Sequence, residues 1–95
     1  MYAVEGPITM GESSARLAEG DEALARGESE FSLKRLAGSD SSALAVLLAW
    51  RRRAQQRNGS LSFVEVPQSL ATLAGLYGVE PFLPGFPEVT PPGTA

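Results

Sequence analysis

The stretch from Gly38 to Gly59 constrains the fold of this chain more than any other. Asp40 precedes two serines and an apolar run at residues 43–50, and three arginines follow that run. A short oxygen-bearing side chain accepts hydrogen bonds from the free backbone N–H groups of a first helical turn, so this order predicts a helix that begins after Asp40. Asn58 and Gly59 tolerate the left-handed conformation that is common at helix ends, and they predict where this helix stops.

The predicted helix has two unlike faces. At about 100° per residue, one broad apolar arc should face a sheet, and it comprises Ala43, Leu44, Leu47, Leu48, Trp50 and Ala54. The opposite stripe is small at its start and polar or cationic at its end, and it comprises Ser41, Ala45, Ala49, Arg52 and Gln56. Because small outward side chains let another backbone approach closely, we interpret this stripe, with the hydroxyls of Ser41 and Ser42 at its amino end, as a candidate docking surface. The alternative is a solvated face whose alanines favour helix formation.

The composition limits the chemistry that is open to the chain. Its 95 residues include no cysteine and no histidine, which excludes disulfides, thiolate sites and the commonest general base and metal ligand. A serine nucleophile would need a base such as Lys34, which serves only when it is buried. No phosphate-cradling glycine loop precedes a lysine. We therefore expect one domain without catalytic residues, a metal site or a cofactor.

Charge and hydropathy restrict the partners and the location of the chain. The net charge of −3 argues against nucleic acid. The basic cluster of Arg51, Arg52, Arg53 and Arg57 falls at the carboxyl end of the predicted helix, where cations favourably oppose the helix dipole. The sequence opens without a signal-peptide pattern, and no apolar run approaches the ~20 residues of a membrane span. We expect a cytoplasmic protein that does not insert into the membrane.

Strand signals occur at three places along the chain. Extended patterns predict strands at residues 2–5, continuing towards Ile8, and again at 29–36 and 60–66. Residues 37–39 are expected to form the turn into the central helix. A strand that contains proline, as the first one does, should be short or lie at a sheet edge.

Helical spacing predicts two further helices, at residues 13–26 and 69–77. Thr9 and Glu12 stand at the spacing of a capping box ahead of the first of these helices, and Gly20 is expected to weaken its middle. The alternation of strands and helices implies an α/β layer with parallel neighbouring strands and helices mainly on one face of a small sheet.

The carboxyl end changes in composition at Pro84. From there on, prolines and glycines dominate, and such a segment buries too little apolar surface to form a core. We therefore predict a domain at residues 1–83 and a flexible tail at 84–95. Phe86 and Val89 are the apolar residues of this tail that would be able to latch onto another surface, although disorder is the favoured interpretation.

Three motifs together resemble a known family. They are Gly6-Pro7-Ile8-Thr9 after the first strand, Asp40-Ser41-Ser42-Ala43-Leu44-Ala45, and the segment from Leu70 that ends Leu76-Tyr77-Gly78-Val79. Their order and spacing are similar to those of a STAS domain, the fold shared by anti-sigma-factor antagonists and the cytoplasmic ends of sulfate transporters. The Ala-Trp-Arg-Arg-Arg-Ala continuation and the Leu-Tyr-Gly-Val ending favour the MlaB type. Proteins of this type are stand-alone subunits of the bacterial ABC transporter that maintains outer-membrane lipid asymmetry.

The resemblance covers about residues 2–83 and has three departures. Only one strand of the usual opening hairpin is evident, which would leave the edge at residues 2–5 open to pairing with another chain. The acid-leucine-serine pattern that usually ends the strand before the helix reads Ser32-Leu33-Lys34 here. Ala43 stands where a glycine commonly follows the Asp-Ser-Ser motif, which would alter access to the hydroxyls.

The resemblance implies a fold and a function. It implies a STAS-like α/β domain with a mixed sheet of three to four strands. It also implies a non-catalytic accessory subunit that binds and supports a MlaF-like ABC transporter ATPase, in complex with a permease, peripheral to the inner membrane. The docking residues implied are Ser41, Ser42, Ala45, Ala49 and Arg52, with Asp40 as the helix cap. The alternative is an anti-sigma-antagonist-like protein switched by phosphorylation of Ser41, and self-association in isolation stays open.

Overall fold

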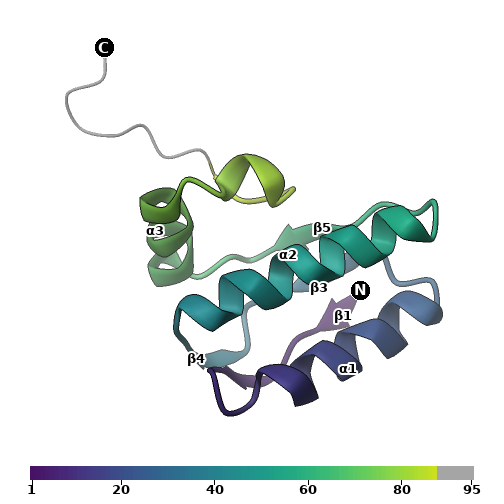
Figure 1. Cartoon of the computed structure of the whole chain (residues 1–95), viewed down its shortest axis with the longest axis horizontal. Coiled ribbons are helices and arrows are strands. Elements are labelled where there is room, and N and C mark those ends of the chain that lie inside the picture. The colour runs from purple at the N-terminus through teal and green to yellow at the C-terminus, as the bar shows by residue number, and fades with distance from the viewer. Residues whose placement is uncertain (88–95) are drawn as a thin grey trace.

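The computed structural model describes residues 1–87 and has two layers. Helices α1 and α2 lie side by side over one face of the strands, and α3 lies at one end of α2 (Figure 1). The helices are α1 Ser13–Ala25, α2 Ser41–Gln56, α3 Gln68–Tyr77 and the short 3-10 helix η1 Glu80–Phe82. The strands are β1 Tyr2–Ala3, β2 Gly6–Ile8, β3 Glu30–Ser32, β4 Leu36–Ser39 and β5 Ser62–Val64.

The strands pair in two parallel ladders. β1, β3 and β5 form a sheet in that order, with Tyr2 opposite Phe31 and Phe31 opposite Phe63. β2 and β4 form a second ladder, which follows the β1–β3 pairing along the same two stretches of chain. Parallel pairing requires crossover connections, and α1 and α2 supply them. The α/β class with helices on one face is therefore confirmed, and all three strand pairings are parallel rather than mixed.

The expectation of one continuous strand at residues 29–36 is wrong. β3 stops at Ser32, the chain turns at Lys34, and β4 occupies Leu36–Ser39. The expected turn at residues 37–39 is therefore a strand. The hydroxyl of the buried Ser32 accepts a hydrogen bond from the backbone N–H of Lys34 at 3.4 Å, which favours the turn over continued extension.

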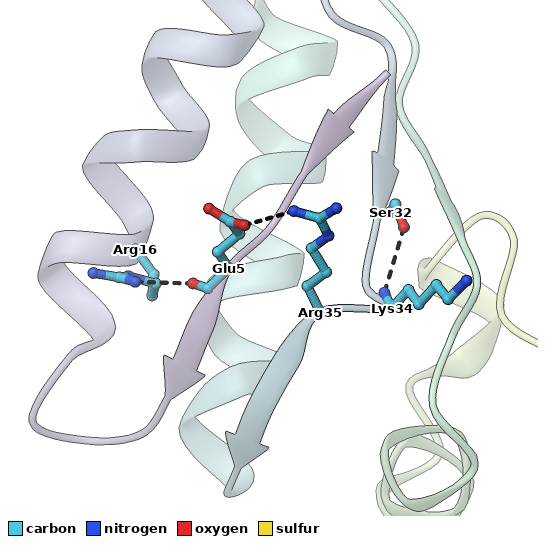
Figure 2. A network of polar contacts seen from close by, with 5 residues as sticks. All are labelled: Glu5, Arg16, Ser32, Lys34 and Arg35. Carbon is cyan, nitrogen blue, oxygen red and sulfur yellow. Dashed lines mark hydrogen bonds and ion pairs between the residues drawn. The ribbon is translucent and has the colours of Figure 1, made fainter.

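A polar network lies where one ladder ends and the next begins (Figure 2). Arg35 pairs with the carboxylate of Glu5 at 2.9 Å, and Arg16 of α1 donates to the Glu5 carbonyl at 2.9 Å. The backbone N–H of Leu36 donates to the carbonyl of Leu33 at 3.3 Å, which closes the turn. The turn between β3 and β4 is thus held by defined hydrogen-bond and ion-pair partners, and it offsets β4 from β3.

Helix α1 differs from its prediction in two respects. The Thr9 hydroxyl donates to the Glu12 carboxylate at 3.0 Å, but Glu12 itself occupies the N-cap and its side chain makes no capping bond. Gly20 is buried against the indole of Trp50, whose Nε1 donates to the carbonyl of Leu17 at 3.1 Å. Gly20 therefore lets the two helices approach closely, which the sequence interpretation of a weak helix middle did not foresee.

The core lies between the sheet and helices α1 and α2. Trp50 and Phe31 have no exposed surface, and their rings meet edge to face at 5.2 Å. The buried residues of α2 are Ala43, Leu44, Val46, Leu47, Trp50 and Ala54. Val46 belongs to this face, whereas Leu48 of the predicted arc is only half-buried. The helix ends as expected, since Asn58 has a left-handed φ of 58°.

The carboxyl end packs further along the chain than expected. Gly78 has a φ of 68° and ends α3. The Pro84 carbonyl accepts a hydrogen bond from the Phe63 N–H of β5 at 2.8 Å. Phe86 is only 8% exposed and its ring lies 5.8 Å from that of Phe63. The packed domain therefore extends beyond the boundary expected at residue 83, through Phe86, while Val89 lies outside the described residues.

Candidate functional site

Asp40 organises the amino end of helix α2. It occupies the N-cap in an extended conformation, and its Oδ1 accepts hydrogen bonds from the Ser42 backbone N–H, at 2.9 Å, and from the Ser42 hydroxyl. Its Oδ2 accepts from the backbone N–H of Met10 at 3.2 Å. The Ser42 hydroxyl, the Ser42 N–H and the Met10 N–H together hold the pKa of this carboxyl below its ordinary value. The carboxylate thus ties the loop before α1 to the first turn of α2.

The two serines after Asp40 are not equivalent. Ser42 is half-buried and its hydroxyl is engaged by Asp40. Ser41 is exposed, and its hydroxyl makes no hydrogen bond within residues 1–87. Ser41 is therefore the hydroxyl at this helix end that a second protein or a modifying enzyme can reach.

The predicted stripe of α2 is open to solvent. Ala45 and Arg52 are exposed, and Ala49 is half-buried. The structure thus places all five predicted docking residues along one side of α2, from the Asp40 turn to the fourth helical turn. The side chains of Ser41, Ala45 and Ala49 do not extend far from the helix axis, so this part of the stripe has a shallow surface.

Helix α1 contributes a second wall that the sequence analysis missed. A groove of about 220 Å³ runs between the two helices, and its α1 side is formed by Ser13, Ser14 and Leu17. Its α2 side is formed by Ser42, Ala45, Val46 and Ala49. The helical spacing of residues 13–26 does not single out Ser13 and Ser14, and only their small size, shared with the α2 stripe, would have indicated a common surface.

The arginines at the end of α2 have different surroundings. Arg53 is half-buried and pairs with Asp21 of α1, so it joins the two helices. Arg52 is exposed and forms no ion pair with any described residue. The groove is therefore flanked by the Asp40 carboxylate at one end and by the exposed guanidinium of Arg52 towards the other.

A second polar region lies on the sheet face away from α1 and α2. Its hollow of about 530 Å³ is lined by Met1, Ala3, Ser32, Lys34, Arg35 and Glu65. The Lys34 side chain is 74% exposed and its Nζ lies 3.8 Å from Glu65, so it is not the buried base that a serine nucleophile would require. Within residues 1–87, no group of three or more carboxylates is placed to hold a metal ion.

None of the helices between residues 1 and 87 has the length and apolar character of a bilayer-spanning segment. This finding agrees with the absence of a long apolar run in the sequence.

Comparisons with known proteins identify the class. A family model described as "Mlab, STAS domain" matches residues 3–84. No curated protein matches the chain. Among solved structures, the chain is similar to the anti-sigma factor antagonist SpoIIAA in its unphosphorylated form, with a TM-score of 0.59 and 18% sequence identity over 93% of this chain and 77% of that chain. At this identity the likeness concerns the fold alone.

Parallel strands crossed by helices on one face, with a capped Asp-Ser-Ser turn opening the central helix, define an α/β domain of the STAS class. The chain belongs to the STAS domain family and, within it, to the MlaB type. The family resemblance drawn from the three sequence motifs is confirmed.

Proposed function

We propose that this chain is a non-catalytic accessory subunit that binds and supports the cytoplasmic ATPase of a bacterial phospholipid ABC transporter of the Mla, lipid-asymmetry type. Domains of this family and fold are known as regulatory or accessory domains. The observation that carries the proposal is the accessible α2 stripe in a chain that the Mlab family model matches over residues 3–84. The chain would act in the cytoplasm, peripheral to the inner membrane through this partner and its permease.

The shape of the stripe supports docking of a helix from the ATPase. Ala45 and Ala49 are one turn apart on α2, and small residues at this spacing allow a second helix to approach closely. The groove of about 220 Å³ beside them offers room for an apolar side chain of that helix. Arg52, one turn further on, presents a guanidinium that can form a bidentate ion pair with a carboxylate of the partner.

The proposal is tested with the cognate ATPase and two matched variants. Ala45→Glu places a charge on the exposed stripe, while Ala15→Glu places the same charge on an exposed position of α1 outside the groove. Co-purification and titration calorimetry should show binding of the parent chain and of Ala15→Glu. Ala45→Glu should bind about tenfold more weakly or worse, because a desolvated charge without a partner is costly at an interface. ATP turnover should change only when a binding-competent chain is added.

Two outcomes would contradict the docking function. An ATPase that neither binds the parent chain nor changes its turnover removes the proposal altogether. Equal binding by the two variants removes the α2 stripe as the docking surface. Circular dichroism of both variants should match that of the parent, since both positions are exposed and helical.

The second candidate function is a phosphorylation switch at Ser41, as in an anti-sigma-factor antagonist. It is favoured by the exposure of Ser41 at the amino end of α2 and by the similarity in fold to SpoIIAA. A phosphate there would meet free N–H groups and the positive end of the helix dipole, while the adjacent Asp40 would oppose it.

Incubation with an anti-sigma kinase and ATP, followed by mass spectrometry, distinguishes this candidate. A phosphate on Ser41, absent in Ser41→Ala and retained in Ser42→Ala, would support it. The absence of any mass gain on Ser41 would count against it, whatever the result with the ATPase.

A further inference from the structure

A patch of large apolar side chains remains exposed on α3 and η1. It comprises Leu76, Tyr77 and Phe82, which are 79%, 60% and 52% exposed. The two elements contact each other, and α3 lies at the amino-terminal end of α2 (Figure 1). Apart from Met10 and Met1, these are the large apolar residues that stay exposed within residues 1–87. Clustered exposed apolar side chains of this kind mark interaction surfaces.

The exposure is not a result of loose packing of α3. Leu70 and Ala74 of the same helix are buried in the core, and Leu83 after η1 is 1% exposed. The Val79 N–H donates to the Ala74 carbonyl at 3.1 Å, so the connection between the two elements is also fixed. Leu76 therefore projects from an anchored helix, and a partner can dock on it without reordering the fold.

The patch lies in a segment that is nearly free of charge. Between Pro67 and Pro87 the only charged residue is Glu80, whereas 20% of the whole chain is charged and the net charge is −3. A partner of opposite charge would find almost nothing to pair with here. A second copy of an acidic chain is repelled by most of the surface, but least where charge is absent. Two-fold association places the same patch on both sides, and an uncharged patch meets that condition without like-charge contact.

We propose that two copies of this chain associate around a two-fold axis through the patch formed by Leu76, Tyr77 and Phe82. Leu76, near the carboxyl end of α3, is the most exposed of the three side chains and packs against the patch of the second copy. The Tyr77 ring adds apolar area to the interface, while its hydroxyl stays at the solvent-exposed rim. Because α3 and η1 carry none of the docking residues of α2, this self-association does not rest on the proposed function.

The test is sedimentation velocity of the purified chain over a concentration series from about 5 µM to about 500 µM, where small interfaces become populated. The sedimentation coefficient of the parent chain should rise from the monomer towards the dimer value. Leu76→Lys should weaken the association about tenfold or more, because it replaces the most exposed apolar side chain of the patch by a charge. The control Ala15→Lys introduces the same charge at an exposed site of α1 and should associate like the parent.

The added lysine separates two explanations of a change in association, overall charge repulsion between copies and contact through the patch. Both variants reduce the net charge from −3 to −2, so association governed by overall repulsion would strengthen in both. Association through the patch strengthens or stays unchanged in the α1 control and is lost only in Leu76→Lys. Raising the NaCl concentration should not dissociate the parent dimer, because salt screens repulsion and leaves apolar burial intact.

Three results would overturn the proposal. The first is a parent chain that stays monomeric across the series. The second is equal association by Leu76→Lys and the α1 control, which would place the contact elsewhere, for example at the β1 edge of the sheet. The third is a monomeric parent chain in which Leu76→Lys instead weakens binding to the ATPase, since the patch would then belong to that partner. Circular dichroism of Leu76→Lys should be native, because the side chain is 79% exposed.

Discussion

Replacing Gly20 by alanine tests the contact between helices α1 and α2. A Cβ built at Gly20 would lie 2.1 Å from Cε2 and 2.2 Å from Nε1 of Trp50. The indole cannot move away easily, because it is fully buried, meets the Phe31 ring at 5.2 Å and donates to the Leu17 carbonyl at 3.1 Å. The added methyl group must therefore push the two helices apart or displace the ring.

Two effects of opposite sign decide the outcome. In an exposed helix interior, glycine to alanine stabilises by about 1 kcal/mol through helix propensity. Overpacking a filled core costs about 1–3 kcal/mol, and loss of the indole hydrogen bond costs about 1 kcal/mol more. We expect Gly20→Ala to lower the free energy of unfolding by about 1–3 kcal/mol. For a chain of this size, that corresponds to a fall in Tm of roughly 5–20 °C.

The assay is urea unfolding followed by circular dichroism and by fluorescence. The chain has one tryptophan, so the fluorescence reports on the altered contact itself. Gly11→Ala is the control, because a Cβ at Gly11 meets nothing within 4 Å. A Gly20→Ala variant that is as stable as the parent or more stable would refute the reasoning, since helix propensity alone predicts that sign.

Three further predictions concern the carboxyl end and the helix cap. Phe86→Ala should lower the free energy of unfolding in urea by about 3 kcal/mol, since the ring is buried against Phe63; an unchanged midpoint would mean that Phe86 does not belong to the core. Gly85→Ala should also destabilise, because Gly85 has a φ of 97° and its Cβ would lie 1.9 Å from the Phe63 carbonyl oxygen; circular dichroism melting checks this. The depressed pKa of Asp40 predicts a contribution to stability that is fully present above its unfolded value of 3.8 and is lost as pH falls through the lower folded value. Urea unfolding at a series of pH values should therefore show the parent and Asp40→Asn converging in stability below pH 3.8, and a constant difference would contradict the assigned cause.

Helix α2 was predicted from local sequence signals. Asp40 bonds to a residue two positions away, and Asn58 adopts its left-handed conformation next to the helix end. These interactions involve neighbours in the chain, so the sequence pattern contains both partners. The exposed stripe of Ser41, Ala45 and Arg52 followed for the same reason, because helical periodicity alone places these residues on one side.

Contacts between segments that are far apart in the chain could not be predicted from local sequence signals. The turn at Lys34 depends on the hydroxyl of Ser32 and on the approach of Glu5, which lies between β1 and β2, to Arg35. Phe86 looked like part of a tail because its neighbours are prolines and glycines, and only the position of Phe63 makes its burial favourable.

The sequence by itself determined the α/β order, the capped central helix and the two unlike faces of that helix, since each follows from spacing within a few residues. The tertiary structure decided which surfaces those faces meet. It brought Gly20 of α1 against Trp50, formed a groove from two helices, and left Leu76 exposed on an anchored α3. Such features depend on the three-dimensional approach of segments that are far apart in the chain, and a one-dimensional pattern does not record that approach.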